Sequence, residues 1–170
     1  SKSLVKSLEK FNLKSPISLI ISPSTLLKEI SFSLFFLIFN NTTINKITTN
    51  ITKPNILMYN ADGDKLARAF GNLLKNAISY SYENTTITIN MIENEENIEI
   101  TFKNKGATIP EYKLERIFDK FYRADESRQT NNGGAGLGLA ITKEIIELHN
   151  GKICAKSNDE FIEFQIELKK

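Results

Sequence analysis

The apolar side chains between residues 62 and 81 recur at helical spacing. They line one face of a predicted helix and are Leu66, Phe70, Leu73, Ala77 and Tyr80. Upstream, Ser22-Pro23 supplies an N-cap and a first-turn proline for a helix over about 23–39. Two further helices are predicted, a short one over 110–118 and a longer one over about 135–149.

Alternating apolar and polar residues predict strands in the remaining segments. Residues 87–91 and 98–102 alternate on either side of a polar turn and predict a hairpin with one solvated face. The segment 40–60 is rich in Thr, Ile and Asn, which favours two short strands. Two more strands are predicted over 151–157 and 161–169. This order of elements indicates an α+β fold, one mixed sheet with helices packed on one face.

The composition is typical of an ordinary globular domain. Of the 170 residues, 41% are apolar and 25% are charged, and the net charge of +2 implies no nucleic acid partner. The most apolar stretch, residues 30–39, is about half of the roughly 20 residues that a bilayer-spanning helix needs. The single cysteine, Cys154, excludes an internal disulfide, and no Cys/His spacing suggests a zinc site. A reducing compartment is the simplest interpretation.

Two asparagines, Asn72 and Asn76, are four residues apart on the helix predicted over 62–81. Side chains at this spacing are neighbours on the helix surface, and Ser79 extends the same polar stripe. Amide oxygens are hard ligands that suit a magnesium ion held mainly by phosphates. Taken alone, the pair is more simply explained by two side chains that face water.

The triplet Asn104-Lys105-Gly106 follows directly after a predicted strand. Gly106 permits a tight backbone turn where a flat nucleotide base could approach. An Asn-x-Gly triplet is also common in ordinary turns. The triplet alone therefore leaves both interpretations open.

Residues 118–123 lie between the predicted short helix and a polar loop, residues 124–134. Phe118 and Phe121 can anchor the base of this loop, which leaves Arg123 to reach a transferring phosphoryl group. A planar cation there would stabilise the developing charge. Two core aromatic residues beside a surface arginine explain the same pattern equally well.

A glycine-rich stretch, residues 133–138, precedes the last predicted helix. It lacks the Gly-Lys-Ser/Thr ending of a P-loop, and it follows a polar loop, whereas a dinucleotide fingerprint follows a strand. Small residues let backbone N–H groups approach phosphate, and the positive end of a helix beginning near Ala135 favours the anion. The stretch is a candidate phosphate-binding loop, with a flexible hinge as the alternative.

In this order the four segments resemble the boxes of the catalytic domain of histidine kinases, in the ATPase superfamily that includes DNA gyrase, Hsp90 and MutL. Residues 72–77 resemble the N box, 104–106 the first glycine box, 118–123 the F box and 134–139 the second glycine box. Longer stretches are similar to the VanS-type sensor kinases of glycopeptide resistance, whereas residues 1–55 match less clearly. The resemblance implies a two-layer α/β sandwich of the Bergerat (GHKL) type, with about five strands packed on about three helices.

The resemblance also implies ATP and Mg²⁺ as ligands and gives roles to matching residues. Asn76, with Asn72, would hold Mg²⁺ on the ATP phosphates, and Asn72 and Arg123 would be the catalytic residues, with Arg123 at the γ-phosphate. Asn104 would meet the adenine amino group. The hinge of the ATP lid would consist of Gly134, Gly136 and Gly138. Other implied ATP contacts are Gly106, Lys120, Tyr122 and Leu137, and Tyr80, Ile109 and Leu139 would line the base pocket.

Four positions depart from patterns in the superfamily. Histidine kinases usually carry Asp at the position of Asn104, whose uncharged amide can still accept from adenine, so weaker binding is expected. Thr108 replaces the second glycine of that box, and Ser79 replaces a frequent phosphate-contacting lysine. Gyrase-like relatives carry a general-base glutamate where this chain has Asn72, which cannot take a proton from water. Phosphoryl transfer is therefore favoured over ATP hydrolysis.

The phosphate-accepting histidine of the family has no counterpart in this sequence. The only histidine, His149, ends a predicted helix, where a structural role at free carbonyls is expected. We expect residues 1–22 to be the remnant of an upstream dimerisation helix or linker and residues 23–170 to be the catalytic domain. The expected partners are that dimerisation domain and a VanR-like response regulator. The full-length protein is expected to be a membrane-anchored homodimer, with this domain cytoplasmic.

Two other functions stay open at this point. The departures at Asn104, Thr108 and Ser79 are also those of a domain that has lost ATP binding and serves as a protein contact surface. A serine kinase of the anti-sigma type shares the fold, but it would not need the F box at residues 118–123 or an upstream helix.

Overall fold

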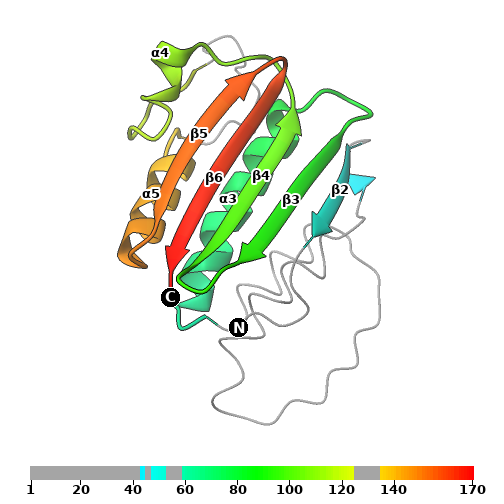
Figure 1. Cartoon of the computed structure of the whole chain (residues 1–170). Helices are drawn as coiled ribbons and strands as arrows, with labels where there is room; N and C mark the ends of the chain where they lie inside the picture. The colour runs from blue at the N-terminus through cyan, green and yellow to red at the C-terminus, as the bar shows by residue number, and fades with distance from the viewer. Residues whose placement is uncertain (1–42, 45–46, 53–58, 125–134) are drawn as a thin grey trace.

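The computed structural model describes residues 43–44, 47–52, 59–124 and 135–170, which form one sheet covered on one face by two helices (Figure 1). The six strands take the order β1-β2-β3-β4-β6-β5. Among these strands only β2 and β3 pair in parallel. The strands are β1 (Thr43–Ile44), β2 (Ile47–Thr52), β3 (Thr86–Glu93), β4 (Asn97–Lys105), β5 (Lys152–Asn158) and β6 (Phe161–Lys169). The helices are α3 (Gly63–Tyr80), α4 (Glu111–Leu114) and α5 (Gly138–Leu148).

The predicted α+β fold with a mixed sheet is confirmed. The sheet has six strands where about five were expected, and β1 at its edge is only two residues long. The helix predicted over 23–39 lies outside the described residues, as does all but the first residue of the loop 124–134. Within the described ranges, no helix is both long and apolar enough to cross a membrane.

Helix α3 forms over almost the predicted range because its cap and its apolar stripe agree. The Asp62 carboxylate accepts a hydrogen bond from the Lys65 backbone N–H at 3.1 Å and caps the first turn. On the buried face, the Phe70 ring lies 5.8 Å from the Phe102 ring of β4, measured between centroids. Packing of this face onto the sheet leaves Asn72 and Asn76 half-buried at its margin.

The side of the sheet that faces the helices is an apolar layer. Buried residues alternate along β4 and β6, in the cross-strand pairs Ile98–Leu168, Ile100–Ile166 and Phe102–Phe164. The next pair in this row joins Asn104 to Ile162, and Asn104 is 2% exposed. A polar side chain therefore ends an otherwise apolar row, close to the point where α3 ends.

Helix α5 begins at Gly138 and not near Ala135 as predicted. Gly136 adopts a φ of +70°, which is left-handed backbone and cannot belong to a right-handed helix. Its carbonyl instead accepts a hydrogen bond from the Phe121 backbone N–H at 3.0 Å. The glycine-rich stretch thus turns against residues 118–123 before the helix starts.

Candidate functional site

Four segments that are far apart in the sequence meet around the C-terminal half of α3. The end of β4 joins the end of α3 through a bridge between Gly106 and Ser81. The start of α5 joins the middle of α3 through a hydrogen bond between Asn72 and Gly138. Residues 118–123 join the approach to α5 through the bond from Phe121 described above. The four boxes recognised in the sequence therefore lie next to one another.

Asn72 connects α3 to the first turn of α5. Its side-chain Nδ2 donates to the Gly138 carbonyl at 3.1 Å and lies 3.5 Å from the Thr142 hydroxyl. That hydroxyl donates to the Gly138 carbonyl at 2.9 Å and is fully buried. The simple alternative that Asn72 is only solvated is therefore wrong, and the amide oxygen is the Asn72 atom left to accept from a ligand.

Asn76 lies one turn after Asn72 on the same side of α3. Within the described residues its side chain is half-buried and has no hydrogen-bond partner. Its amide oxygen is thus available to a ligand at the margin of the sheet. Amide oxygens fit Mg²⁺, which accepts a few protein ligands together with phosphate oxygens and water.

Asn104 and Gly106 form the end of β4 beside the last residue of α3. Within the described residues the Asn104 Nδ2 atom is buried without a hydrogen-bond partner. A Cβ on Gly106 would lie 2.2 Å from the Tyr80 carbonyl oxygen and 3.4 Å from Asn104 Nδ2. Because Gly106 has no side chain, the end of α3 can approach the end of β4 closely. The Asn104 amide without a partner lies beside this contact.

Thr108 and Ile109 attach the segment after β4 to the turn between β5 and β6. The Thr108 hydroxyl accepts from the Glu160 backbone N–H at 3.0 Å. The Ile109 backbone N–H donates to the Ser157 hydroxyl at 2.9 Å. Ile109 is half-buried against the core. The unexpected Thr108 thus has a structural partner where the family pattern has glycine.

Residues 118–123 contact the core through one phenylalanine. Phe118 packs edge-on against Phe164 of β6, with ring centroids 6.2 Å apart. Phe121 is 71% exposed, so the prediction that its ring anchors the loop base is wrong. Its φ of +65° directs the backbone N–H to Gly136, and a Cβ on Gly136 would lie 2.9 Å from the Phe121 carbonyl carbon. Backbone contact, and not a second buried ring, joins the two boxes.

The polar residues of this segment have different surroundings. Lys120 Nζ lies 2.7 Å from Glu144 Oε1 on α5, and both side chains are more than half exposed. Such a pair is weak enough for a phosphate to compete with it. Tyr122 is half-buried, with the Arg116 guanidinium 4.5 Å from its ring centroid, and Arg123 is exposed.

The described part of the second glycine box consists of residues 135–139, and Gly134 lies outside the described residues. Gly138 is the first residue of α5, and Leu137 precedes it without a side-chain cap. Leu139 is half-buried against the core. Within the described residues no side chain caps the N-terminus of α5, which lies next to the Asn72 side chain and could accept an anion.

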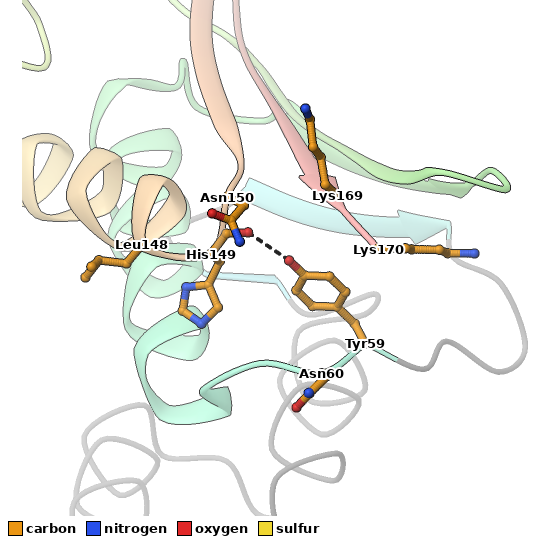
Figure 2. Close-up of a pocket in the computed structure, with 7 residues that line it drawn as sticks. All are labelled: Tyr59, Asn60, Leu148, His149, Asn150, Lys169 and Lys170. Carbon is orange, nitrogen blue, oxygen red and sulfur yellow. Dashed lines mark hydrogen bonds between the residues drawn. The ribbon is translucent and has the colours of Figure 1, made fainter.

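A cavity of about 500 Å³ lies at the opposite end of the sheet (Figure 2). None of the predicted site residues is among its described lining, which consists of Tyr59, Asn60, Leu148, His149, Asn150, Lys169 and Lys170. The Tyr59 hydroxyl donates to the His149 carbonyl at 3.0 Å, and burial raises the pKa of Tyr59. Its volume alone does not make this cavity the site, because the predicted boxes meet elsewhere.

His149 has the structural role predicted from its place at the end of a helix. Its Nδ1 lies 2.7 Å from the Ile145 carbonyl, and its Nε2 accepts from the Asp62 backbone N–H at 3.1 Å. A neutral ring with the proton on Nδ1 satisfies both contacts. The ring therefore ties the end of α5 to the start of α3.

Thr142 is the site residue that sequence reasoning missed. It is the one polar residue among the buried residues of α5, where it also lies 3.4 Å from the Ala69 carbonyl of α3. A threonine four residues after Gly138, within an apolar helical stripe, was the available signal. Its partners on α3 could not be predicted, because they are about 70 residues away in the sequence.

A family model described as histidine kinase-, DNA gyrase B-, and HSP90-like ATPase matches residues 61–170. The sensor protein VanS of Enterococcus faecium is 51% identical over 118 residues, which cover 69% of this chain and 30% of VanS. The sensor protein VanSC of Enterococcus gallinarum is 46% identical over 109 residues, covering 64% of this chain and 30% of VanSC. The chain thus spans about 30% of the length of these relatives.

Solved structures share the fold. The catalytic domain of histidine kinase ThkA matches with a TM-score of 0.65 at 29% identity, over 85% of this chain and 90% of that one. The mycobacterial sensor histidine kinase MprB matches with a TM-score of 0.65 at 22% identity, over 85% of this chain and 94% of that one, and supports the fold alone. Since the family model covers well over half of the sequence, this chain belongs to the histidine kinase-, DNA gyrase B- and HSP90-like ATPases.

Proposed function

We propose that this domain binds Mg-ATP at the meeting point of the four boxes and, in the intact kinase, donates the γ-phosphate to a histidine. The observation that carries this proposal is the hydrogen bond between Asn72 and the Gly138 carbonyl, which joins residues 66 positions apart. It brings the N box against the second glycine box. The phosphates of a nucleotide would lie between these two elements, at the N-terminus of α5.

The residues of α3 fit a magnesium ion on those phosphates. Asn76 has no competing partner within the described residues, and the Asn72 amide is oriented by α5 so that its oxygen can accept. Mg²⁺ held there would neutralise part of the phosphate charge. Asn76 and Asn72 are therefore the proposed metal ligands.

The end of β4 fits the base of the nucleotide. A buried amide without a partner is costly, and a base edge would supply the missing acceptor for Asn104 Nδ2. Tyr80, Gly106, Ile109 and Leu139 are half-buried or buried. We assign them to the base pocket. Lys120, Tyr122, Arg123, Gly134, Gly136, Leu137 and Gly138 are assigned to the phosphate side.

The chemistry at Asn72 favours phosphoryl transfer over hydrolysis. Water attack on ATP is helped by a general base, and an amide has no proton-accepting capacity of this kind. Asn72 also uses its NH₂ group to hold the start of α5. Arg123, exposed at the border of the site, is proposed to stabilise charge on the transferred group.

The acceptor histidine is proposed to lie on a dimerisation domain that precedes residue 23. His149 is a poor candidate, since both ring nitrogens are engaged between α3 and α5. From the similarity to VanS, we propose a membrane-anchored homodimeric kinase that passes the phosphate to a VanR-like regulator in glycopeptide-resistance signalling. This domain would lie on the cytoplasmic side.

A phosphotransfer assay tests this function. The domain is mixed with the separately produced dimerisation domain of the same kinase and labelled ATP, and acid-labile phosphohistidine is measured. We expect labelling with wild type and little with Asn76→Ala. Absence of phosphohistidine despite saturating ATP would refute the transferase role. Absence of ATP binding at millimolar concentration would instead favour a protein contact module.

A further inference from the structure

The Asn104 side chain is a hydrogen-bond donor without an acceptor. It is 2% exposed, and within the described residues its Nδ2 atom is buried with no partner. Buried polar atoms are rarely left unpaired in native proteins. An orphaned donor at the end of a strand, inside a nucleotide-binding domain, indicates that a ligand supplies the acceptor.

The neighbours of Asn104 along the sheet supply no side-chain acceptor. Its cross-strand partner is Ile162, and the residue before it in the buried row is Phe102. Gly106 lies close by, since a Cβ at this glycine would be 3.4 Å from Nδ2. Within the described residues no hydrogen bond fixes the orientation of this amide, and a turn about its last torsion would exchange the positions of its oxygen and nitrogen.

This freedom matters for the edge of a purine. Adenine presents a donor at position 6 and an acceptor at position 1, and hypoxanthine presents the reverse, an acceptor at position 6 and a donor at position 1. An amide carries one donor group and one acceptor and can match either edge with two hydrogen bonds. An ionised carboxylate only accepts, so in the same position it would favour adenine and repel a 6-oxo group.

We propose that Asn104 gives this domain relaxed purine selectivity, so that nucleoside triphosphates of 6-oxopurines bind as well as ATP. The proposal rests on the nucleotide-binding function proposed above. It adds that the residue at position 104 sets the preference between 6-amino and 6-oxo bases. The proposal concerns binding, and the identity of the base leaves the phosphate side of the site unchanged.

Binding of ATP and inosine triphosphate is the direct test, because the two bases differ only at positions 6 and 1. Both are titrated with Mg²⁺ into wild type, Asn104→Asp and Asn90→Asp by calorimetry. Asn90→Asp makes the same change in charge at an exposed position on β3. We expect wild type and Asn90→Asp to bind the two nucleotides within about tenfold of each other, and Asn104→Asp to shift the preference toward ATP by about tenfold or more.

The outcomes separate this proposal from the function on which it rests. If wild type binds ATP but binds inosine triphosphate more than about tenfold less tightly, the relaxed selectivity is overturned while ATP binding stands. If neither nucleotide binds at millimolar concentration, nucleotide binding itself is overturned. Thermal melts check that each variant folds. If Asn104→Asp does not fold, the ratio of the wild-type affinities for ATP and inosine triphosphate decides whether the selectivity is relaxed.

Discussion

The contact between Gly106 and the end of α3 allows a sharp test by a single methyl group. In Gly106→Ala the new Cβ would lie 2.2 Å from the Tyr80 carbonyl oxygen, far inside van der Waals contact. The backbone at Gly106 fixes the position of the Cβ, and the oxygen belongs to the backbone of α3, so neither can turn aside as the far end of a side chain would. Overpacking of this kind costs about 1–3 kcal/mol. We expect the free energy of unfolding to fall by about 2 kcal/mol, or roughly 4–8 °C in melting temperature for a domain of this size.

A second glycine provides the control. Gly71 lies in the interior of α3, and a Cβ there would meet no atom within 4 Å. Gly71→Ala should therefore raise the free energy of unfolding by about 0.5–1 kcal/mol, because alanine favours the helix and restricts the unfolded chain. Urea unfolding followed by circular dichroism measures both variants. Equal stability of Gly106→Ala and Gly71→Ala would refute the close approach of β4 to the end of α3.

Three further predictions follow from the hydrogen bonds that hold the helices. Asp62→Ala should lose about 1 kcal/mol of unfolding free energy at pH 7, because it removes the cap on the Lys65 N–H. That hydrogen bond lowers the pKa of Asp62, so the cap stabilises the fold fully above the ordinary carboxyl pKa of 3.8 and is lost as the pH falls through the lower pKa of the folded state. Urea melts at pH 7 and pH 2.5 should therefore show that wild type is more stable than Asp62→Ala by a smaller margin at the lower pH. An equal margin at both pH values would contradict the capping role. Asn72→Ala and Thr142→Val should each lower the free energy of unfolding by about 1–2 kcal/mol. The double variant should lose less than the sum of the two, because both side chains donate to the Gly138 carbonyl. Additive losses in this double-mutant cycle would argue against a shared contact. His149→Ala should lower stability by about 1 kcal/mol and leave phosphorylation of the dimerisation domain intact, whereas loss of phosphorylation in a folded variant would give this histidine a catalytic role.

Local patterns predicted the elements well where the signals in the sequence agreed on a boundary. The helix expected over 62–81 is found at Gly63–Tyr80, since the cap at Asp62 and the apolar stripe coincide. The strands of both hairpins also lie where alternation placed them. The start of α5 was missed because Gly136 is left-handed, and nothing in a run of glycines says which of them leaves the helical region.

The sequence predicted which residues belong to the candidate site, but it did not predict which residues contact one another there. The boxes marked Asn72, Asn76 and Asn104 as polar residues of interest, but their neighbours depend on how α5 and β4 meet α3. The donor role of Asn72 toward Gly138 is one such contact. The exposure of Phe121 is another, because its ring was expected in the core and only its backbone joins the site.

The most direct test of the account is the affinity for Mg-ATP of wild type, Asn76→Ala and the control Asn90→Ala. Asn76 lies at the proposed metal position on α3, and Asn90 is exposed on β3. We predict that Asn76→Ala weakens Mg-ATP binding by about tenfold or more, that Asn90→Ala binds as wild type does, and that EDTA removes the difference. Equal Mg-ATP affinity of wild type and Asn76→Ala would contradict the proposed site.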